Sequence, residues 1–321
     1  MRRTILLSLL ALGVPAAALA AEEPAAAPPP AASAPAPAAV ASPAPTTPAA
    51  ADAPIEVPAR AEPSPAQREL QALITRQQKL FAAAAKENNP NFDEENFRTD
   101  MQNLCFDYDT YLKKYPDTAA GFAAYGVLLG KIDMRKQAAA MLLKANALDP
   151  NLPLVKNQLG NYLAEEGKPL EAVNYFVSAI RLAPNEPLYH YQLGTLLYEA
   201  RDDFLKSGEW KRPALERAMH AAFRKAAELA PDRVEFVYRY GESFYDLETP
   251  DWEGALKVWS ALEEKLKPGL EQETIRLHAA NVLIKQGRFD HARALLATVQ
   301  TEGLAKQKEK LVAQLPETAK K

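Results

Sequence analysis

The chain has 321 residues, a formal net charge of −3 and a hydrophobic content of 48%. This composition is sufficient for a sizeable core, and it lacks the concentrated basic charge that a nucleic-acid-binding face or an anionic membrane surface would attract. The single cysteine, Cys105, excludes an intramolecular disulfide framework.

Residues 1–20 have the pattern of a secretory signal peptide. Arg2 and Arg3 give a basic start, and an apolar stretch then leads to a small-x-small cleavage signal that ends at Ala20. Because the apolar stretch is too short to span a bilayer, cleavage is favoured over an uncleaved anchor. The sequence therefore predicts an exported protein with no integral membrane segment after signal cleavage, periplasmic if the source has two membranes.

Residues 21–66 consist mainly of alanine and proline and contain half of the chain's 26 prolines. Few large apolar side chains are present to offset the entropy cost of ordering, and each proline removes a backbone donor. We therefore expect a disordered, extended linker of polyproline type. Its role is open between a simple spacer and a reach across the cell envelope.

Residues 67–116 predict a divergent first helical hairpin. Apolar residues recur at three- and four-residue steps from Leu70 to Ala84, which is typical of one helix face. In the second helical pattern, Asn91 and Glu94 suit a capping box, and Pro116 lies just beyond the end. No run alternates with period two for long enough to indicate a strand, so the expected fold class is all-α.

A repeat of 34 residues dominates the sequence from residue 117 to residue 300. A glycine after a large residue recurs at this step, as do the closing prolines: Gly126, Gly160 and Gly194, and Pro116, Pro150 and Pro184. Glycine within a helix costs about 1 kcal/mol relative to alanine, so its recurrence indicates a gain in packing. We expect Gly160 and Ala172 to let two helices cross closely, and Phe176 to fill the space to the next hairpin.

These residues resemble the tetratricopeptide repeat (TPR) family, whose unit is a helix–turn–helix hairpin of 34 residues. Two later units with insertions and a degenerate last unit extend the pattern, through Phe223, Pro231, Gly241, Trp259 and Ala292. The resemblance implies a right-handed α-solenoid of about five to six TPR hairpins. Residues 301–321 are polar and are expected to form a C-terminal capping helix and tail.

The sequence nominates no catalytic residue. The four histidines form no metal-binding pair at i and i+4, and there is no glycine-rich phosphate loop. The serine of "GESFYD" lacks the glycine of a nucleophile elbow. We therefore expect a protein that is not an enzyme and that carries no cofactor and no metal.

In the family, the first helix of each unit lines a concave groove, and counting from each glycine identifies the residues facing it. The candidates for partner binding are Asn157, Asn161, Tyr191, Thr195, Tyr198, Tyr238, Glu242, Tyr245 and Asn281. Four of them are tyrosines in two pairs of equal spacing, which should share one face of neighbouring helices. Tyrosine offers apolar area and a hydroxyl, as interface hot spots do. Whether these rings bind a partner or pack helix against helix stays open.

Some family members bind carboxylate tails through a lysine followed four residues later by an asparagine. Asn161 and Asn281 match the asparagine, but Asn157 and Leu277 occupy the lysine positions. This clamp is therefore not expected here.

The sequence thus predicts an exported TPR scaffold that binds a protein or peptide in a tyrosine-lined groove. One alternative is a cell-wall or glycan-binding accessory, or an enzyme-associated envelope protein, in which the tyrosines stack on sugars. Another is a solenoid that self-associates. An insertion at 201–213 carries Phe204 and Trp210 among charged residues. It is interpreted either as an elongated loop beyond the groove's edge or as a further partner contact.

Overall fold

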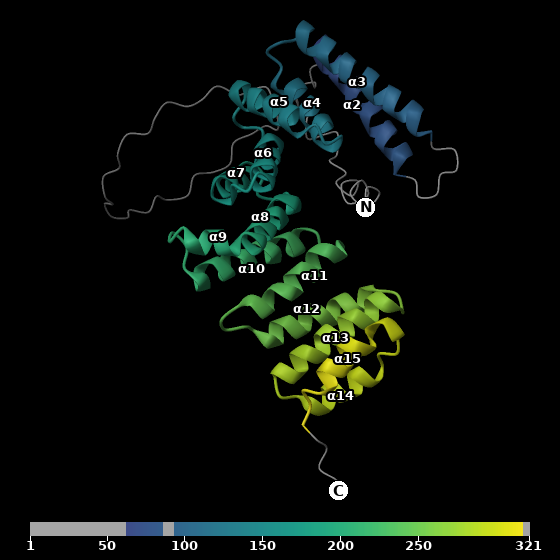
Figure 1. Ribbon diagram of the computed structural model, residues 1–321, viewed down its shortest axis with the longest axis vertical. Helices are drawn as coiled ribbons and strands as arrows, with labels where there is room; N and C mark the ends of the chain where they lie inside the picture. The colour runs from purple at the N-terminus through teal and green to yellow at the C-terminus, as the bar shows by residue number, and fades with distance from the viewer. Residues whose placement is uncertain (1–61, 86–92, 317–321) are drawn as a thin grey trace, which may run out of the picture. The chain divides into compact units, whose positions relative to one another are not determined.

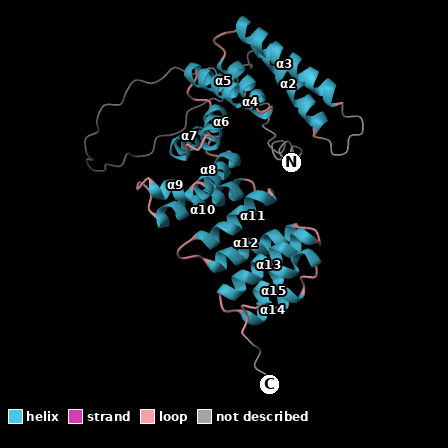
Figure 2. Cartoon of the chain, viewed as in Figure 1, coloured by secondary structure: helices cyan, strands magenta, loops and turns pink. Residues whose placement is uncertain are grey.

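The computed structural model describes residues 62–85 and 93–316, so the predicted signal peptide and most of the predicted linker lie outside the described residues. Within these ranges every regular element is helical, which confirms the all-α prediction (Figures 1 and 2). The chain divides into two compact units, Met1–Ala124 and Tyr125–Lys321. No helix of the described ranges combines the length and apolarity needed to cross a membrane.

The first unit contains α2 (Pro65–Ala84), α3 (Glu94–Lys114) and the start of α4 (Ala119–Lys131). α2 begins two residues before the predicted start, because Ser64 and Gln67 form a capping box through bonds of 3.2 and 2.7 Å. The N-cap of α3 is Asp93, whose carboxylate accepts from two backbone N–H groups. Asn91, the first residue of the capping box expected with Glu94, lies outside the described residues.

Tyrosines of α3 hold the α2–α3 hairpin together. The hydroxyl of Tyr108 donates to Gln77 Oε1 at 3.0 Å, and both side chains are buried. The hydroxyl of Tyr111 donates to the carbonyl of Ala66 at 3.2 Å. Buried polar groups are costly unless they are paired, so these bonds fix the register of the two helices.

The second unit begins within α4 and continues as consecutive hairpins. After α5 (Arg135–Leu148) come the pairs α6 (Pro153–Glu165) with α7 (Pro169–Leu182), α8 (Pro187–Glu199) with α10 (Arg212–Leu229), α11 (Val234–Ser243) with α12 (Trp252–Lys265), and α13 (Leu270–Lys285) with α14 (Phe289–Ala297). Shorter elements are α9 (Arg201–Lys206), the 3-10 turns η2 (Phe244–Asp246) and η3 (Glu302–Leu304), and α15 (Ala305–Val312). A first and a second helix thus alternate along the chain, as the 34-residue repeat predicts.

In four of the described hairpins, a glycine on the first helix receives a large side chain from the second helix. A Cβ atom added to the glycine would lie 2.8 Å from Leu142 at Gly126, 3.0 Å from Phe176 at Gly160, 2.8 Å from Phe223 at Gly194 and 2.6 Å from Trp259 at Gly241. Only glycine fits contacts this close. The Phe176 ring lies on Gly160 of its own hairpin and also belongs to one buried cluster with Leu196 and Leu197 of the next hairpin, in agreement with its expected role.

The insertion at 201–213 folds back onto the solenoid instead of projecting from it. Phe204 on α9 is 0% exposed and packs among residues of α7, α8 and α10. Trp210 meets the Phe204 ring edge-on, with the ring centroids 5.6 Å apart. The aromatic residues of the insertion therefore belong to the core of the α8–α10 hairpin, which corrects the elongated-loop interpretation.

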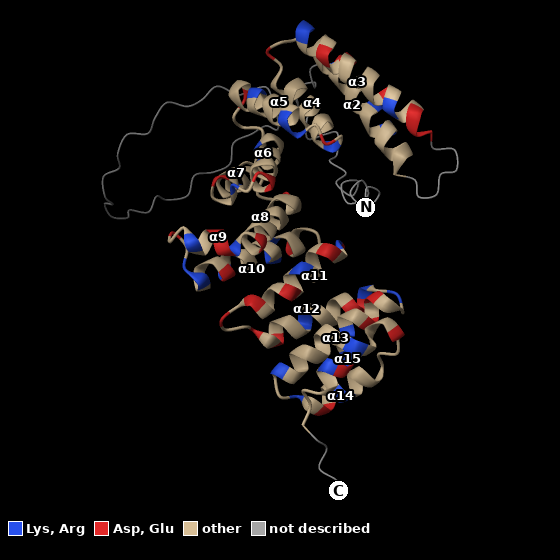
Figure 3. Cartoon of the chain, in the orientation of Figure 1, with Lys and Arg blue, Asp and Glu red and all other residues tan. Residues whose placement is uncertain are grey.

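The end of the described chain packs against the last hairpin. Buried apolar residues of α13, α14 and the following turns form one cluster there: Leu277, Ala280, Leu296, Val299 and Leu304. α15 lies against α13 and α14 and is polar on its outer side. Acidic and basic residues are interspersed along the described helices, as Figure 3 shows.

Candidate interaction site on α8 and α11

The predicted groove residues lie on the first helices of four successive hairpins. Asn157 and Asn161 are on α6, Tyr191, Thr195 and Tyr198 on α8, Tyr238 and Glu242 on α11, Tyr245 in η2, and Asn281 on α13. The counting frame therefore identifies helices that follow one another in the solenoid. Exposure and contacts separate these residues into different groups.

The prediction that Asn157 contacts a partner is corrected by its burial. Its side chain is 0% exposed, and both amide atoms lack a hydrogen-bond partner within the described structure. A partner cannot reach a side chain that is enclosed on all sides, so Asn157 belongs to the interior. Asn161 and Asn281 are partly exposed.

Tyr191 connects α8 to α11. Its ring stacks on Phe236 with the centroids 4.6 Å apart, and its hydroxyl donates to Glu235 Oε1 at 2.9 Å. Burial, reinforced by the Glu235 carboxylate, raises the pKa of Tyr191 to about 12. Its ring and hydroxyl are thus both engaged within the protein.

Tyr238 and Tyr245 enclose His278 at the packing of α11 and η2 against α13. The Tyr238 hydroxyl is 2.9 Å from His278 Nε2, and the Tyr245 hydroxyl is 3.4 Å from Nδ1. The imidazole stacks on Trp259, with the centroids 4.4 Å apart. Burial is the main cause that raises the pKa of both tyrosines. This pair mainly joins helix to helix.

Tyr198 differs from the other three tyrosines because 41% of it is exposed. The guanidinium of Arg239 lies 4.5 Å from its ring centroid and that of Arg201 lies 5.5 Å away. Arg239 pairs with Glu242 at 2.6 Å, and Arg201 pairs with Asp246 at 2.8 Å. We call these five residues the Tyr198 face.

The sequence frame found Tyr198 and Glu242 but missed Arg201, Arg239 and Asp246. Arg201 is three residues from Tyr198, and Arg239 is three residues from Glu242. Residues three apart in a helix are neighbours on its surface. That spacing was the signal available in the sequence. The Arg201–Asp246 contact joins two hairpins, so no local spacing could reveal it.

The Tyr198 face is suited to binding rather than to bond chemistry. Its aromatic ring is flanked by two guanidinium groups, and each guanidinium is already paired with a carboxylate. Such a surface offers apolar area with a polar rim, which is the usual composition of a protein interface. Across residues 62–85 and 93–316, no group of three histidine, cysteine or acidic residues could hold a metal ion.

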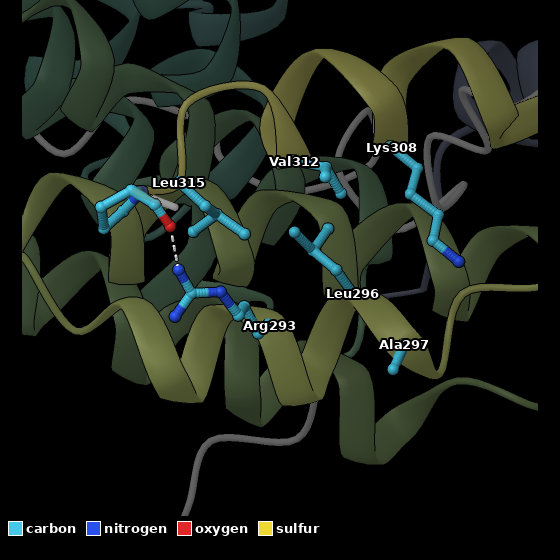
Figure 4. Close-up of a pocket in the computed structure, with 7 residues that line it drawn as sticks. Arg293, Leu296, Ala297, Lys308, Val312 and Leu315 are labelled. Carbon is cyan, nitrogen blue, oxygen red and sulfur yellow. Dashed lines mark hydrogen bonds between the residues drawn. The ribbon is translucent and has the colours of Figure 1, made fainter. Parts of the chain in front are cut away.

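A separate pocket of about 400 Å³ lies between α14 and α15 (Figure 4). Leu296 and Val312 provide apolar lining, and each of the two cations that line the pocket donates to a backbone carbonyl. Arg293 donates to the carbonyl of Pro316, and Lys308 donates to that of Val299 at 2.7 Å. The pocket therefore marks the junction that holds the last helix, and no predicted groove residue lines it.

No protein-family model matches this chain, and no curated protein matches it. Among solved structures, YrrB, a TPR protein with an unusual peptide-binding site, is 19% identical with a TM-score of 0.52, and the match covers 63% of this chain and 97% of that chain. PilF of Pseudomonas aeruginosa is 14% identical with a TM-score of 0.54, and the match covers 78% of this chain and 100% of that chain. At these identities the likeness shows the fold alone: the chain has the tetratricopeptide-repeat fold, an all-α solenoid of helical hairpins.

Proposed function

We propose that this protein is an exported, non-catalytic interaction scaffold that holds a protein or peptide partner against the Tyr198 face. The observation that carries the proposal is the 41% exposure of Tyr198 beside arginines from two hairpins. YrrB, which shares the fold, has a peptide-binding site. This likeness supports a binding role for the solenoid.

The Tyr198 face is rigid enough to bind at low entropic cost. Arg201 and Arg239 are 21% and 23% exposed, and each is held by an ion pair. A ring whose neighbours are already ordered loses little freedom on association, which favours affinity. Tyr191, Tyr238 and Tyr245 act as internal supports of the same helices.

The proposed location follows from the signal-peptide pattern of residues 1–20. It predicts export, to the periplasm in a cell with two membranes. Fractionation of cells that produce the full chain, and of cells that produce a version without residues 1–20, tests the location. Equal amounts of both forms in the cytoplasm would contradict it.

The binding role is tested by affinity capture from a cell-envelope extract, followed by calorimetry with the captured partner. Tyr198→Ala should raise the dissociation constant at least about 30-fold, which is equivalent to a loss of about 2 kcal/mol of binding free energy. The matched control is Phe106→Ala on α3, which removes a ring that is 67% exposed and lies outside the Tyr198 face. An unchanged dissociation constant in Tyr198→Ala would defeat the assignment.

Purified peptidoglycan used as bait in the same assay tests the glycan alternative. Stacking on sugar needs an open ring face, and Arg239 already lies over the Tyr198 ring. We therefore expect no retention on peptidoglycan. Retention that is lost in Tyr198→Ala would favour the glycan-binding accessory over the protein scaffold.

A further inference from the structure

α11 is held from two sides by histidines that the binding site does not use. His220 on α10 contacts α11 through Ser243, and His278 on α13 contacts it through Tyr238. Both imidazoles lie at packing surfaces between successive helices. A change in their charge therefore acts directly on the packing of α11.

The hydrogen bonds around His220 place a proton on Nδ1. Ser243 Oγ donates its only proton to the carbonyl of Tyr240 at 2.7 Å, so it accepts from His220 Nδ1 at 2.9 Å. A second proton would go to Nε2 and would place a positive charge on this ring where α10 packs against α11. The Phe244 ring lies 4.5 Å away, and an apolar neighbour of this kind opposes a charged imidazole.

The charged groups around His220 are few and of mixed sign. Burial first, and then Arg224 one turn further along α10, lower the pKa of His220 to about 4, while Asp251 opposes them. One turn earlier on α10, Glu216 is engaged by Arg212 at 2.7 Å. From α11 the Tyr240 phenol ring contacts His220, with the ring centroids 5.2 Å apart. The neutral form of His220 is therefore favoured in the folded chain.

His278 is matched to its neighbours only while it is neutral. One ring nitrogen faces the Tyr238 hydroxyl at 2.9 Å, and the other faces the Tyr245 hydroxyl at 3.4 Å. Neutral imidazole offers one donor and one acceptor, whereas the protonated ring offers two donors. On protonation the Tyr238 hydroxyl would have to accept from Nε2 and direct its own proton elsewhere.

Glu242 is the charged group that faces His278 from α11. Burial lowers the pKa of His278, and Glu242 opposes this effect. No titratable side chain stands one turn away on α13, where the residues are Thr274, Ile275, Asn281 and Val282. Trp259, which stacks on the ring from α12, carries no titrating group.

Glu242 also connects His278 to the Tyr198 face. Its carboxylate contributes to raising the pKa of Tyr238 and accepts from Arg239 at 2.6 Å. A Tyr238 proton directed to Glu242 would compete with Arg239, which lies over Tyr198. Protonation of His278 is thereby coupled to the arrangement of the Tyr198 face.

We propose that α11 is an acid-sensitive joint: protonation of His220 and His278 loosens α11 from α10 and α13 and disorganises the Tyr198 face. Both groups take up protons less readily in the packed state than in the loosened state. The stabilisation is therefore complete above the ordinary histidine pKa of about 6.5 and is lost as the pH falls below it. The loosening of α11 does not depend on the proposed function, whereas its effect on partner binding rests on it.

Hydrogen exchange of the full mature chain between pH 7.5 and pH 5, corrected for intrinsic exchange, tests the joint. Exchange in α11 should accelerate at least about ten-fold relative to α6 as the pH falls. In the double variant His220→Asn with His278→Gln, the acceleration should shrink to within about two-fold, because neither position titrates. His291→Gln, at an exposed histidine on α14, is the matched control and should behave as the wild type.

Equal acid-induced exchange in the double variant and the wild type would overturn the proposal. Nuclear magnetic resonance titration of the two imidazoles in the wild type provides a test that needs no variant. Midpoints at or above about 6.5 would also overturn it. A partner affinity that falls over the same pH range supports the link to the Tyr198 face. If α11 loosens while the affinity stays unchanged, the assignment of partner binding to the Tyr198 face is contradicted, and the acid-sensitive joint still holds.

Discussion

Tyr191 and Tyr198 on α8, and Tyr238 and Tyr245 on α11 and η2, occupy matching positions in two successive hairpins, 47 residues apart. The second pair encloses a histidine, whereas in the first pair Tyr191 stacks on Phe236 and Tyr198 stays exposed. Equal sequence positions thus have unequal roles. The repeat determines which helix face a side chain occupies, and the neighbouring hairpin determines whether a partner can reach it.

Two structural differences explain the contrast. α8 continues as regular helix through Tyr198 to Glu199, whereas α11 ends at Ser243 and places Tyr245 in a 3-10 turn. The neighbours differ as well. Beside Tyr198 stands Arg239, a long and charged side chain, whereas beside Tyr245 stands His278 stacked on Trp259.

The largest expected effect separates the two pairs by stability. Tyr245→Ala should lower the free energy of unfolding by about 3 kcal/mol, because it opens a cavity beside Trp259 and His278 and removes the contacts of the hydroxyl. Tyr198→Ala should cost less than about 1 kcal/mol, since its ring is partly solvated. Urea unfolding of both variants measures the difference. Equal losses would show that exposure does not distinguish the two positions.

The fold was predictable because its signals are local and repeated. Gly160 and Pro184 recur with their counterparts at a fixed step, and each has a packing or punctuation role that one hairpin can express. The start of α2 was missed by two residues because Ser64 lies in a stretch dominated by alanine and proline. The burial of Phe204 was missed because a charged stretch gives no indication that it folds back.

An effect of intermediate size tests whether the two hairpins share one packing rule. Gly194→Ala and Gly241→Ala should each cost about 1–3 kcal/mol, because the added methyl group would press into Phe223 or Trp259. Gly130→Ala on α4 is the control, since its Cβ would meet Ala138 at an ordinary 3.9 Å. It should be neutral or stabilising by about 0.5–1 kcal/mol.

Urea unfolding midpoints of the three glycine variants provide the measurement. Similar losses of unfolding free energy in Gly194→Ala and Gly241→Ala would show that the two hairpins pack alike internally. The difference between the tyrosine pairs would then arise from the contacts between hairpins. A loss at Gly241 alone would instead place the contrast within the α11–α12 hairpin. A loss at Gly130 would contradict the close-contact explanation.

The candidate site was only partly predictable for a physical reason. Counting from each glycine locates Tyr198 and Glu242, because a helix fixes directions within itself. Whether Asn157 is enclosed depends on side chains of other helices, and the sequence frame carries no information about them. The pairing of Arg201 with Asp246 likewise depends on how α9 folds back, which the hydrophobic pattern of the insertion does not encode.

The smallest expected effect tests the ion pair that joins the α8–α10 hairpin to the α11–α12 hairpin. Arg201 and Asp246 are 21% and 24% exposed, and their atoms are 2.8 Å apart. A double-mutant cycle with Arg201→Met and Asp246→Asn should give a coupling energy of about 1 kcal/mol, above that of most exposed pairs because part of the water is excluded. Unfolding in low and high salt measures the coupling.

The exposed pair Arg224–Glu228 on α10 is the matched control for this cycle. Its atoms are 3.6 Å apart, its side chains are 56% and 53% exposed, and both partners lie on one helix. Its coupling should be about 0.3–0.5 kcal/mol and should fall in high salt, whereas that of Arg201 with Asp246 should persist. If both couplings were equally small and equally screened, Arg201 would not fix the Tyr198 face. The exposure of Tyr198 would then reflect only the course of α8, and the insertion would contribute to the α8–α10 hairpin alone.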